Sequence, residues 1–145
     1  MSGGPFDAEA PLARLMLLAS RWFDAQSREL LAQRGWPRLS AAQTLLFAQL
    51  LPGGITVAEL ARRLGTSRQA THEMVRGLVS LGFLELADDP RRRGGRLVHL
   101  TPYGHELVAD SYTVLRQLET TLPTRHMDAL RKALGTLRLS PYEQS

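Results

Sequence analysis

The side chains best suited to chemistry in this sequence are the arginines of the segment DDPRRRGGR, residues 88–96. A guanidinium group keeps its charge and binds phosphate oxygens through paired hydrogen bonds. Pro90 and the adjacent Gly94 and Gly95 favour a turn that would present these groups. The arginines are Arg91, Arg92, Arg93 and Arg96. Taken alone, the segment would be a solvated charge run. Its neighbours in the chain must show whether it is instead a loop held in a defined place.

A second set of polar side chains falls on one face of a helix predicted over residues 67–81. At 100° per residue, the exposed side carries Arg68, Gln69, His72 and Arg76, with Glu73 and Val75 at the flanks. The side expected to be buried carries Ala70, Met74, Leu78 and Leu81, with Gly77 beside them at a close helix contact. Arginine pairs with guanine, glutamine with adenine, and an apolar group with the thymine methyl. This face is therefore a candidate surface for reading base pairs, and the competing interpretation is an ordinary solvated helix face.

The segment ahead of this helix completes the outline of a helix-turn-helix. Thr56 and Glu59 have the spacing of a capping box, in which each side chain binds the other residue's backbone N–H. Gly65 suits a left-handed residue after a short helix, and Ser67 suits the cap of the next one. The face expected to be buried in the short helix carries Val57, Leu60, Ala61 and Leu64. A short helix, a tight turn and a longer helix form the DNA-binding helix-turn-helix.

Two short strands are predicted on either side of the basic segment, at residues 83–87 and 96–100. They form a hairpin with residues 88–95 as its long loop. Thr101 then caps a helix that has Pro102 at its first position. A helix-turn-helix followed by a hairpin with a basic loop is a winged helix.

The rest of the chain is predicted to be helical. A helix over residues 8–34 has an apolar stripe, but Leu17 and Leu18 fall outside it. Such a helix has more than one neighbour. It is either a central core helix or one shared with a second subunit. The stripe consists of Leu12, Leu15, Met16, Ala19, Trp22, Phe23 and Leu30.

Three further helices are predicted around the winged helix. One begins at a capping box formed by Ser40 and Gln43 and runs to about Leu51. The helix capped by Thr101 ends at Pro123, and Thr124 caps the last one. The apolar stripe of the helix capped by Thr101 is Leu107, Ser111, Val114, Leu115, Leu118 and Leu122. The stripe of the last helix is Met127, Leu130, Leu134 and Leu137. Residues 1–6 and 140–145 are expected to be loose ends.

Composition excludes several classes of protein. The chain has 145 residues, of which 43% are hydrophobic and 22% charged, as in a globular domain. It has no cysteine, so disulfides, thiolate metal sites and thiol redox switches are excluded. No apolar stretch reaches 18 residues, and the N-terminal segment lacks the positive charge of a secretory signal. Residues 56–101 hold eight basic and five acidic groups, which is most of the net charge of +4.

Neither catalysis nor metal binding is predicted. The sequence has no phosphate-binding glycine loop, no Gly-x-Ser-x-Gly and no paired-histidine metal motif. His105, Glu106 and Asp110 lie close together on one predicted helix. A solvated helix face explains them better than a metal site, because His99 and His126 have no suitable spacing to them. We therefore predict no catalytic residue, no metal and no cofactor.

The segment TVAELARRLGTSRQATHEMVRGLVSLGFLELADDPRRRGGRLVHLTPYG, residues 56–104, resembles the MarR family of bacterial and archaeal transcription regulators. The most specific parts are the run LGFLEL and the wing from Asp-Pro to LTPYG. The resemblance implies a mainly α (α+β) fold over 1–145, with a winged helix-turn-helix at about 40–101 and a two-stranded wing. It also implies a dimerisation lobe made of residues 7–36 and 102–139.

The same resemblance implies a cytoplasmic homodimer that represses transcription by binding a pseudo-palindrome in double-stranded DNA. It implies release by a small aromatic or phenolic effector. The predicted DNA contacts are Thr66, Ser67, Arg68, Gln69, Thr71, His72, Arg76, Arg91, Arg92, Arg93 and Arg96. The candidate effector contacts are Trp22, Phe47 and Tyr112. The competing interpretation is that these side chains only pack in the hydrophobic core. The alternative function is a winged helix that binds protein without specific DNA readout.

The wing departs from the family pattern at one position. Family wings often read Asp-Pro-x-Asp-Arg-Arg, and here Arg92 stands where the second aspartate is common. In the family, that aspartate helps to orient the wing arginine, which is Arg93 in this alignment. Asp88 or Asp89 is left to orient the wing. With Gly94 and Gly95 in the loop, we predict a mobile wing that becomes ordered on DNA.

Overall fold

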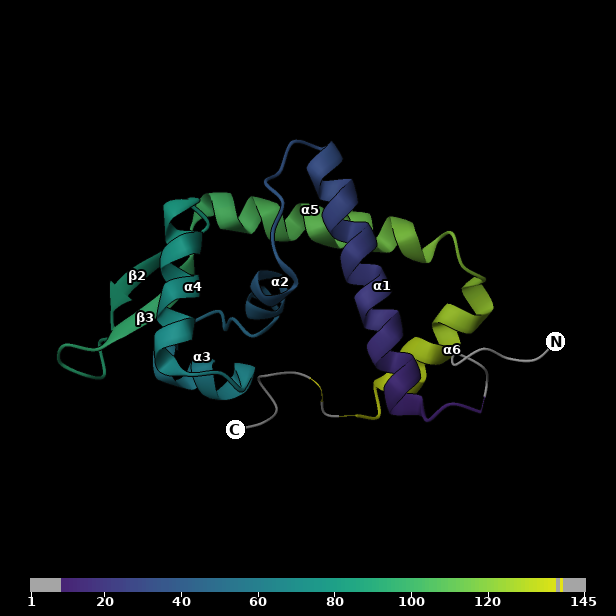
Figure 1. Ribbon diagram of the computed structural model, residues 1–145, viewed down its shortest axis with the longest axis horizontal. Helices are drawn as coiled ribbons and strands as arrows, with labels where there is room; N and C mark the ends of the chain where they lie inside the picture. Colours follow the sequence, from purple (N-terminus) through teal and green to yellow (C-terminus); the bar gives the residue numbers. More distant parts are fainter. Residues whose placement is uncertain (1–8, 138, 140–145) are drawn as a thin grey trace.

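The computed structural model describes residues 9–137 and 139, so the predicted loose ends at residues 1–6 and 140–145 lie outside it. The helices are α1 (Leu12–Gln33), α2 (Ala41–Ala48), α3 (Val57–Leu64), α4 (Arg68–Ser80), α5 (Pro102–Glu119) and α6 (Thr124–Leu134). The strands are β1 (Ile55–Thr56), β2 (Leu84–Asp88) and β3 (Arg96–Leu100). The predicted class, mainly α with a winged helix-turn-helix, is confirmed. The wing lies at one end of the molecule and α6 at the other, with α5 running between them (Figure 1).

The predicted helix caps are mostly confirmed. The Ser40 and Gln43 side chains form the complete capping box at α2. The hydroxyls of Thr56, Ser67 and Thr101 each accept a hydrogen bond from the backbone N–H three residues on. The Glu59 carboxylate, however, binds arginines of its own helix, so the box predicted at α3 is only half formed. At α6 the cap residue is Pro123, and Thr124 is the first helical residue.

Several boundaries differ from the prediction. α1 begins at Leu12 rather than near residue 8, after the cap residue Pro11, and α2 ends at Ala48 rather than near Leu51. β2 runs one residue later than predicted. The loop that precedes α3 also supplies a third strand, because Ile55 and Thr56 pair with Val98 and Leu97 of β3. Two residues are too few to show the alternation that marks a strand in sequence.

The core of the winged helix is closed by a cluster of aromatic rings. Phe83 is completely buried and stacks on Tyr103, with ring centroids 4.9 Å apart. Trp36 and Phe47 contact the same ring at 6.0 and 6.2 Å. The Phe83 carbonyl also accepts a hydrogen bond from the Thr101 N–H. Phe83 therefore joins the base of the wing to α5 and to the chain that enters α2.

The buried face of α4 is rotated from the one predicted. Its buried residues are Thr71, Val75 and Leu78, whereas Leu81 is 42% exposed. Thr71 can be buried because its hydroxyl donates to the Ser67 carbonyl oxygen at 2.8 Å, so no polar atom is left unsatisfied. No atom outside the local chain lies within 4 Å of a side chain built at Gly77, so the predicted close helix contact there is wrong.

The helices outside the winged helix leave apolar surface uncovered. α1 buries only Ser27 and Leu31, and no residue of α6 is buried. Leu17, one of the two residues outside the α1 stripe, is 57% exposed. The other exposed large apolar side chains of α1, α5 and α6 are Leu12, Met16, Trp22, Tyr103, Tyr112 and Leu130. A single copy of the chain therefore leaves much of the apolar surface of these side chains open to solvent.

Candidate nucleic-acid interface

The turn between α3 and α4 fixes how α4 projects from the molecule. Gly65 ends α3 in the left-handed conformation with φ of 67°, which costs glycine little. Thr66 follows, and Ser67 caps α4 by accepting from the Ala70 N–H at 3.1 Å. Thr66 and Ser67 are exposed at this end of the helix. The first turn of α4 is thus anchored by local hydrogen bonds, while its outer face is open to solvent.

The outer face of α4 carries most of the side chains expected to read DNA. Thr71, Val75 and Leu78 face the core, so the exposed side is polar along the helix. The exposed polar residues of α4 ahead of Gly77 are Arg68, Gln69, His72, Glu73 and Arg76. Thr71 was also predicted to contact DNA, but its side chain is completely buried. It is excluded from the interface because it cannot reach a partner in solvent.

Arg62 of α3 is a candidate contact that the sequence did not single out. It lines a shallow depression of about 500 Å³ together with Thr66 and Arg68. Glu59 lies in the same depression and accepts hydrogen bonds from Arg62 and Arg63. The Arg62 hydrogen bond is the main cause that lowers the pKa of Glu59 to about 2. The carboxylate therefore stays ionised near neutral pH and holds the Arg62 guanidinium beside the start of α4.

A hydrogen-bonded loop forms the tip of the wing. The Asp89 N–H donates to the Gly95 carbonyl at 2.9 Å, and the Gly95 N–H donates to the Arg92 carbonyl at 3.0 Å. Gly94 has a φ of 75°, which again favours glycine. Arg91, Arg92, Arg93 and Arg96 are all exposed. The loop thus turns its guanidinium groups outward, and the expected mobility of the wing stays a prediction.

The two aspartates of the wing have different surroundings. The Asp89 side chain is only 6% exposed, accepts from the Arg91 N–H at 2.9 Å and lies 3.6 Å from Arg91 Nε. Asp88 is exposed at the end of β2 and faces Arg96 across the strand pair. Asp89 is therefore the aspartate that holds the loop, and its partner is Arg91 rather than Arg93.

Replacing Asp89 by alanine is expected to weaken binding to double-stranded DNA by about threefold to tenfold, the value of one or two lost hydrogen bonds. The substitution removes the acceptor for the Arg91 N–H and lets the loop open. Fluorescence anisotropy with a labelled duplex measures the change. Asp88→Ala is the matched control and should leave affinity unchanged or raise it, because it removes an exposed negative charge. Equal losses in the two variants would contradict a special role for Asp89.

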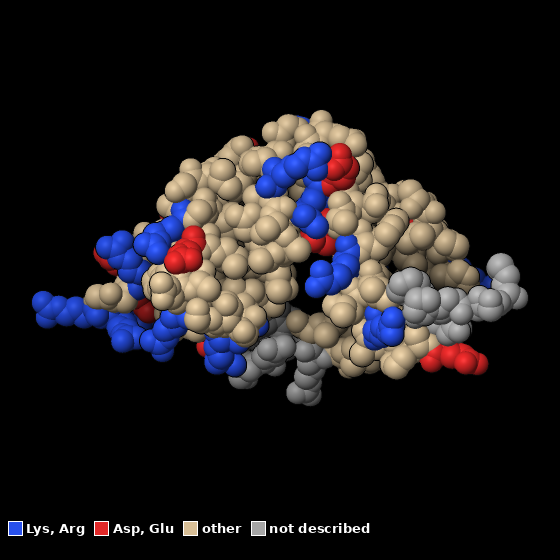
Figure 2. All heavy atoms as spheres, viewed as in Figure 1, with Lys and Arg blue, Asp and Glu red and all other residues tan. Residues whose placement is uncertain are grey.

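The arginines of the wing, α3 and α4 lie at one end of the molecule. Figure 2 shows blue Lys and Arg side chains gathered at the end that holds these elements in Figure 1. Such a cluster concentrates positive potential where a polyanion would bind. The helix face with hydrogen-bonding groups and the basic wing therefore lie at the same end of the molecule.

The three candidate effector contacts lie on three different helices, α1, α2 and α5. Trp22 is 43% exposed and contacts Phe23, with ring centroids 5.0 Å apart. Phe47 packs against Phe83 in the winged-helix core. Tyr112 is 68% exposed and lines an open depression of about 400 Å³ on α5. Within the described part of the chain, no ring contact joins any two of the three.

His105, Glu106 and Asp110 show no arrangement suited to a metal ion. In the described part of the chain, no group of three or more His, Asp or Glu side chains could hold one. Asp110 instead accepts hydrogen bonds from Trp36 Nε1 at 2.7 Å and from Arg34 at 3.2 Å. Among residues 9–137, no helix has both the length and the apolar character needed to cross a membrane.

The helix-turn-helix and the hairpin that follows it define this protein as a winged-helix protein. The model of the MarR family matches residues 38–94, which cover the helix-turn-helix, β2 and most of the wing loop. Over these residues, and over most of the chain in the structural matches below, the protein resembles the MarR family of winged-helix transcription regulators. No curated protein sequence matches the chain.

The structural matches extend well beyond the family model. The apo form of MarR from E. coli is 26% identical, with a TM-score of 0.68, over 87% of this chain and 96% of that one. A structure named Multiple Antibiotic Resistance Repressor, MarR, is 25% identical, with a TM-score of 0.67, over 87% and 94%. MepR, a transcription regulator of the Staphylococcus aureus multidrug efflux pump MepA, is 18% identical, with a TM-score of 0.60. The match covers 87% of this chain and 95% of that one. At this identity the likeness shows only a shared fold.

Proposed function

We propose that this protein binds double-stranded DNA sequence-specifically as a homodimer and represses transcription in the cytoplasm of a bacterium or archaeon. The observation that carries the proposal is the exposed polar face of α4, which lies at the same end of the molecule as the arginines of the wing. A helix with these dimensions fits the major groove, and arginines of a wing can reach the neighbouring backbone or minor groove. Repression is supported by the name of a similar structure, a multiple antibiotic resistance repressor.

The uncovered apolar side chains support the dimer. Leu12, Leu17 and Trp22 of α1 and Leu130 of α6 are each at least 43% exposed, and all lie outside the winged helix. Apolar side chains gathered on a few helices are typical of a surface that packs against another chain. A second copy would pack against these helices and leave both α4 faces free. Two α4 helices related by two-fold symmetry would then meet half-sites about one helical turn apart.

The dependence of DNA affinity on salt tests this proposal. Each phosphate contact releases counterions, so six contacts give a slope of about −5 in log affinity against log salt concentration. We expect such a slope for a duplex selected from a random-sequence pool, and much weaker binding to a scrambled duplex of equal length. A winged helix that binds only protein would give weak binding with little salt dependence and no sequence preference, and would contradict the proposal.

Release by an aromatic or phenolic effector stays a prediction, with Trp22, Phe47 and Tyr112 as its candidate contacts. Adding a panel of aromatic acids to the same binding measurement tests it. Loss of affinity that saturates with one acid would support an effector, and unchanged affinity with every acid would count against one of this class.

A further inference from the structure

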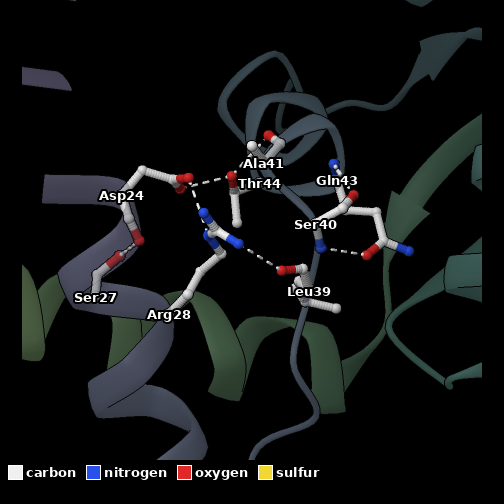
Figure 3. Close-up of polar contacts among 8 residues, drawn as sticks. All are labelled: Asp24, Ser27, Arg28, Leu39, Ser40, Ala41, Gln43 and Thr44. Carbon is white, nitrogen blue, oxygen red and sulfur yellow. Dashed lines mark hydrogen bonds and ion pairs between the residues drawn. The ribbon is translucent and has the colours of Figure 1, made fainter. Parts of the chain in front are cut away.

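A polar network joins α1 to the winged helix at the point where the two parts of the molecule meet. Asp24 of α1 accepts hydrogen bonds from Arg28 Nε at 3.0 Å and from the Thr44 hydroxyl of α2 at 2.7 Å. Arg28 also donates to the Leu39 carbonyl at 3.2 Å. Figure 3 shows these groups converging from α1, α2 and the segment that precedes α2. We call Asp24, Arg28, Thr44 and the Leu39 carbonyl the α1–α2 network.

The network is partly shielded from water, which strengthens it. The side chains of Asp24 and Arg28 are 26% and 30% exposed. Both groups are charged, and charge-assisted hydrogen bonds in a medium of reduced dielectric are stronger than those at an open surface. The Thr44 hydroxyl also lies 2.8 Å from the Ala41 carbonyl. The Thr44 hydroxyl has one proton to donate. It donates to the Asp24 carboxylate, because a charged acceptor forms a stronger hydrogen bond than the Ala41 carbonyl.

The contact between α2 and Asp24 of α1 is polar. Leu45, next to Thr44, is 51% exposed, whereas Leu46 is completely buried in the winged-helix core. α2 therefore buries Leu46 in the core, while Thr44 of the same helix bonds to Asp24. Further along, Leu31 is buried and Trp36 binds Asp110 of α5. The contacts of Leu31 and Trp36 attach the C-terminal end of α1 to the rest of the molecule. The α1–α2 network attaches α2 to the middle of α1.

We infer that Asp24, Arg28 and Thr44 are positioning residues for DNA recognition: they hold the winged helix at a fixed angle to α1. This inference rests on the proposed function, in which α1 contributes to the dimer and α4 reads DNA. The angle between α1 and the winged helix then sets the distance between the two α4 helices of the dimer. That distance determines which separation of half-sites the protein accepts.

The predicted consequence is a change in spacing preference. Inserting one base pair between half-sites moves one of them by about 3.4 Å and rotates it by about a tenth of a turn. With the angle fixed, the wild-type dimer should bind such a duplex at least about tenfold more weakly, a loss comparable to one mismatched base pair. With the network broken, the winged helices can adjust, and the same insertion should cost less than about threefold.

The test uses the full chain and the duplex that wild-type protein selects from a random-sequence pool. Variants of this duplex have one base pair added or removed between the half-sites. The proteins are wild type, Thr44→Val, Arg28→Gln and the control Arg38→Gln. Arg38 also links α1 to the segment before α2, through Glu29, but the two side chains are 67% and 50% exposed. An ion pair this exposed contributes little, so the control should keep the wild-type spacing preference.

Three results are decisive. The inference is supported if Thr44→Val and Arg28→Gln lose most of the spacing preference while Arg38→Gln keeps it. Circular dichroism must show wild-type helical content in all three variants. Spacing preferences equal to wild type in both network variants overturn it and leave the proposed function intact. Failure of the wild-type chain to select any duplex overturns the proposed function and this inference with it. Thr44→Val removes one hydroxyl, so it tests the network even if Arg28→Gln does not fold.

Discussion

The variant in which Arg68 and Arg76 are both alanine is expected to bind its selected duplex about 10²- to 10⁴-fold more weakly than wild type. Both arginines lie on the exposed face of α4, eight residues apart and therefore about 80° from each other around the helix axis. Each can form a forked contact with guanine or with a phosphate, which alanine cannot replace. Fluorescence anisotropy at one fixed salt concentration, with selected and scrambled duplexes, measures the loss.

The double variant Arg38→Ala, Arg116→Ala is its control. It makes the same change in net charge at side chains that are 67% and 70% exposed and lie outside the winged helix. We expect a loss of less than about threefold, because exposed charges more than a Debye length of about 8 Å from DNA are screened. If both double variants weaken binding equally, general charge rather than the α4 face accounts for the affinity, and sequence-specific reading by α4 is wrong.

The second large effect is on folding: Phe83→Ala should lower the free energy of unfolding by about 3–5 kcal/mol. Phe83 is completely buried and its ring contacts those of Trp36, Phe47 and Tyr103. Alanine leaves a cavity where the base of the wing, α5 and the entry to α2 meet. Since small domains have only about 5–15 kcal/mol of stability, the variant should be partly unfolded at mild urea concentrations. Urea unfolding followed by circular dichroism at constant protein concentration measures it.

Tyr103→Ala is the matched control for Phe83. Its ring stacks on Phe83, but the residue is 43% exposed, so its removal leaves no closed cavity. We expect it to cost at least about 1 kcal/mol less than Phe83→Ala, because less apolar area returns to water. Equal destabilisation by the two substitutions would show that the aromatic cluster is not centred on Phe83.

The features predicted well from the sequence have their partners nearby in the chain. The Ser40, Thr56, Ser67 and Thr101 caps each bind a backbone N–H three residues away, and all four were predicted. Gly65 was likewise predicted to be left-handed. The hydroxyl, the turn and the first helical residues belong to one short segment, so local propensity decides these structures before any tertiary contact forms.

Predictions that depended on the environment of a residue were less successful. Thr71 was predicted to contact DNA, but the packing of α4 buries it. β1 exists because β3 supplies its hydrogen bonds from 41 and 43 residues further along the chain. The wing could be located from its residues, yet the choice of Asp89 over Asp88 required the path of the loop.

The sequence by itself determined the order of the helices, their caps, the position of the wing and the presence of a basic surface. Only the tertiary structure decided which residues α4 buries, which aspartate holds the wing and how α1 is joined to the winged helix. Asp24 and Thr44 are 20 residues apart in the chain, and Trp36 and Asp110 are 74 apart. Contacts over such distances depend on how helices pack, and no local pattern of residue types encodes the angle between two helices.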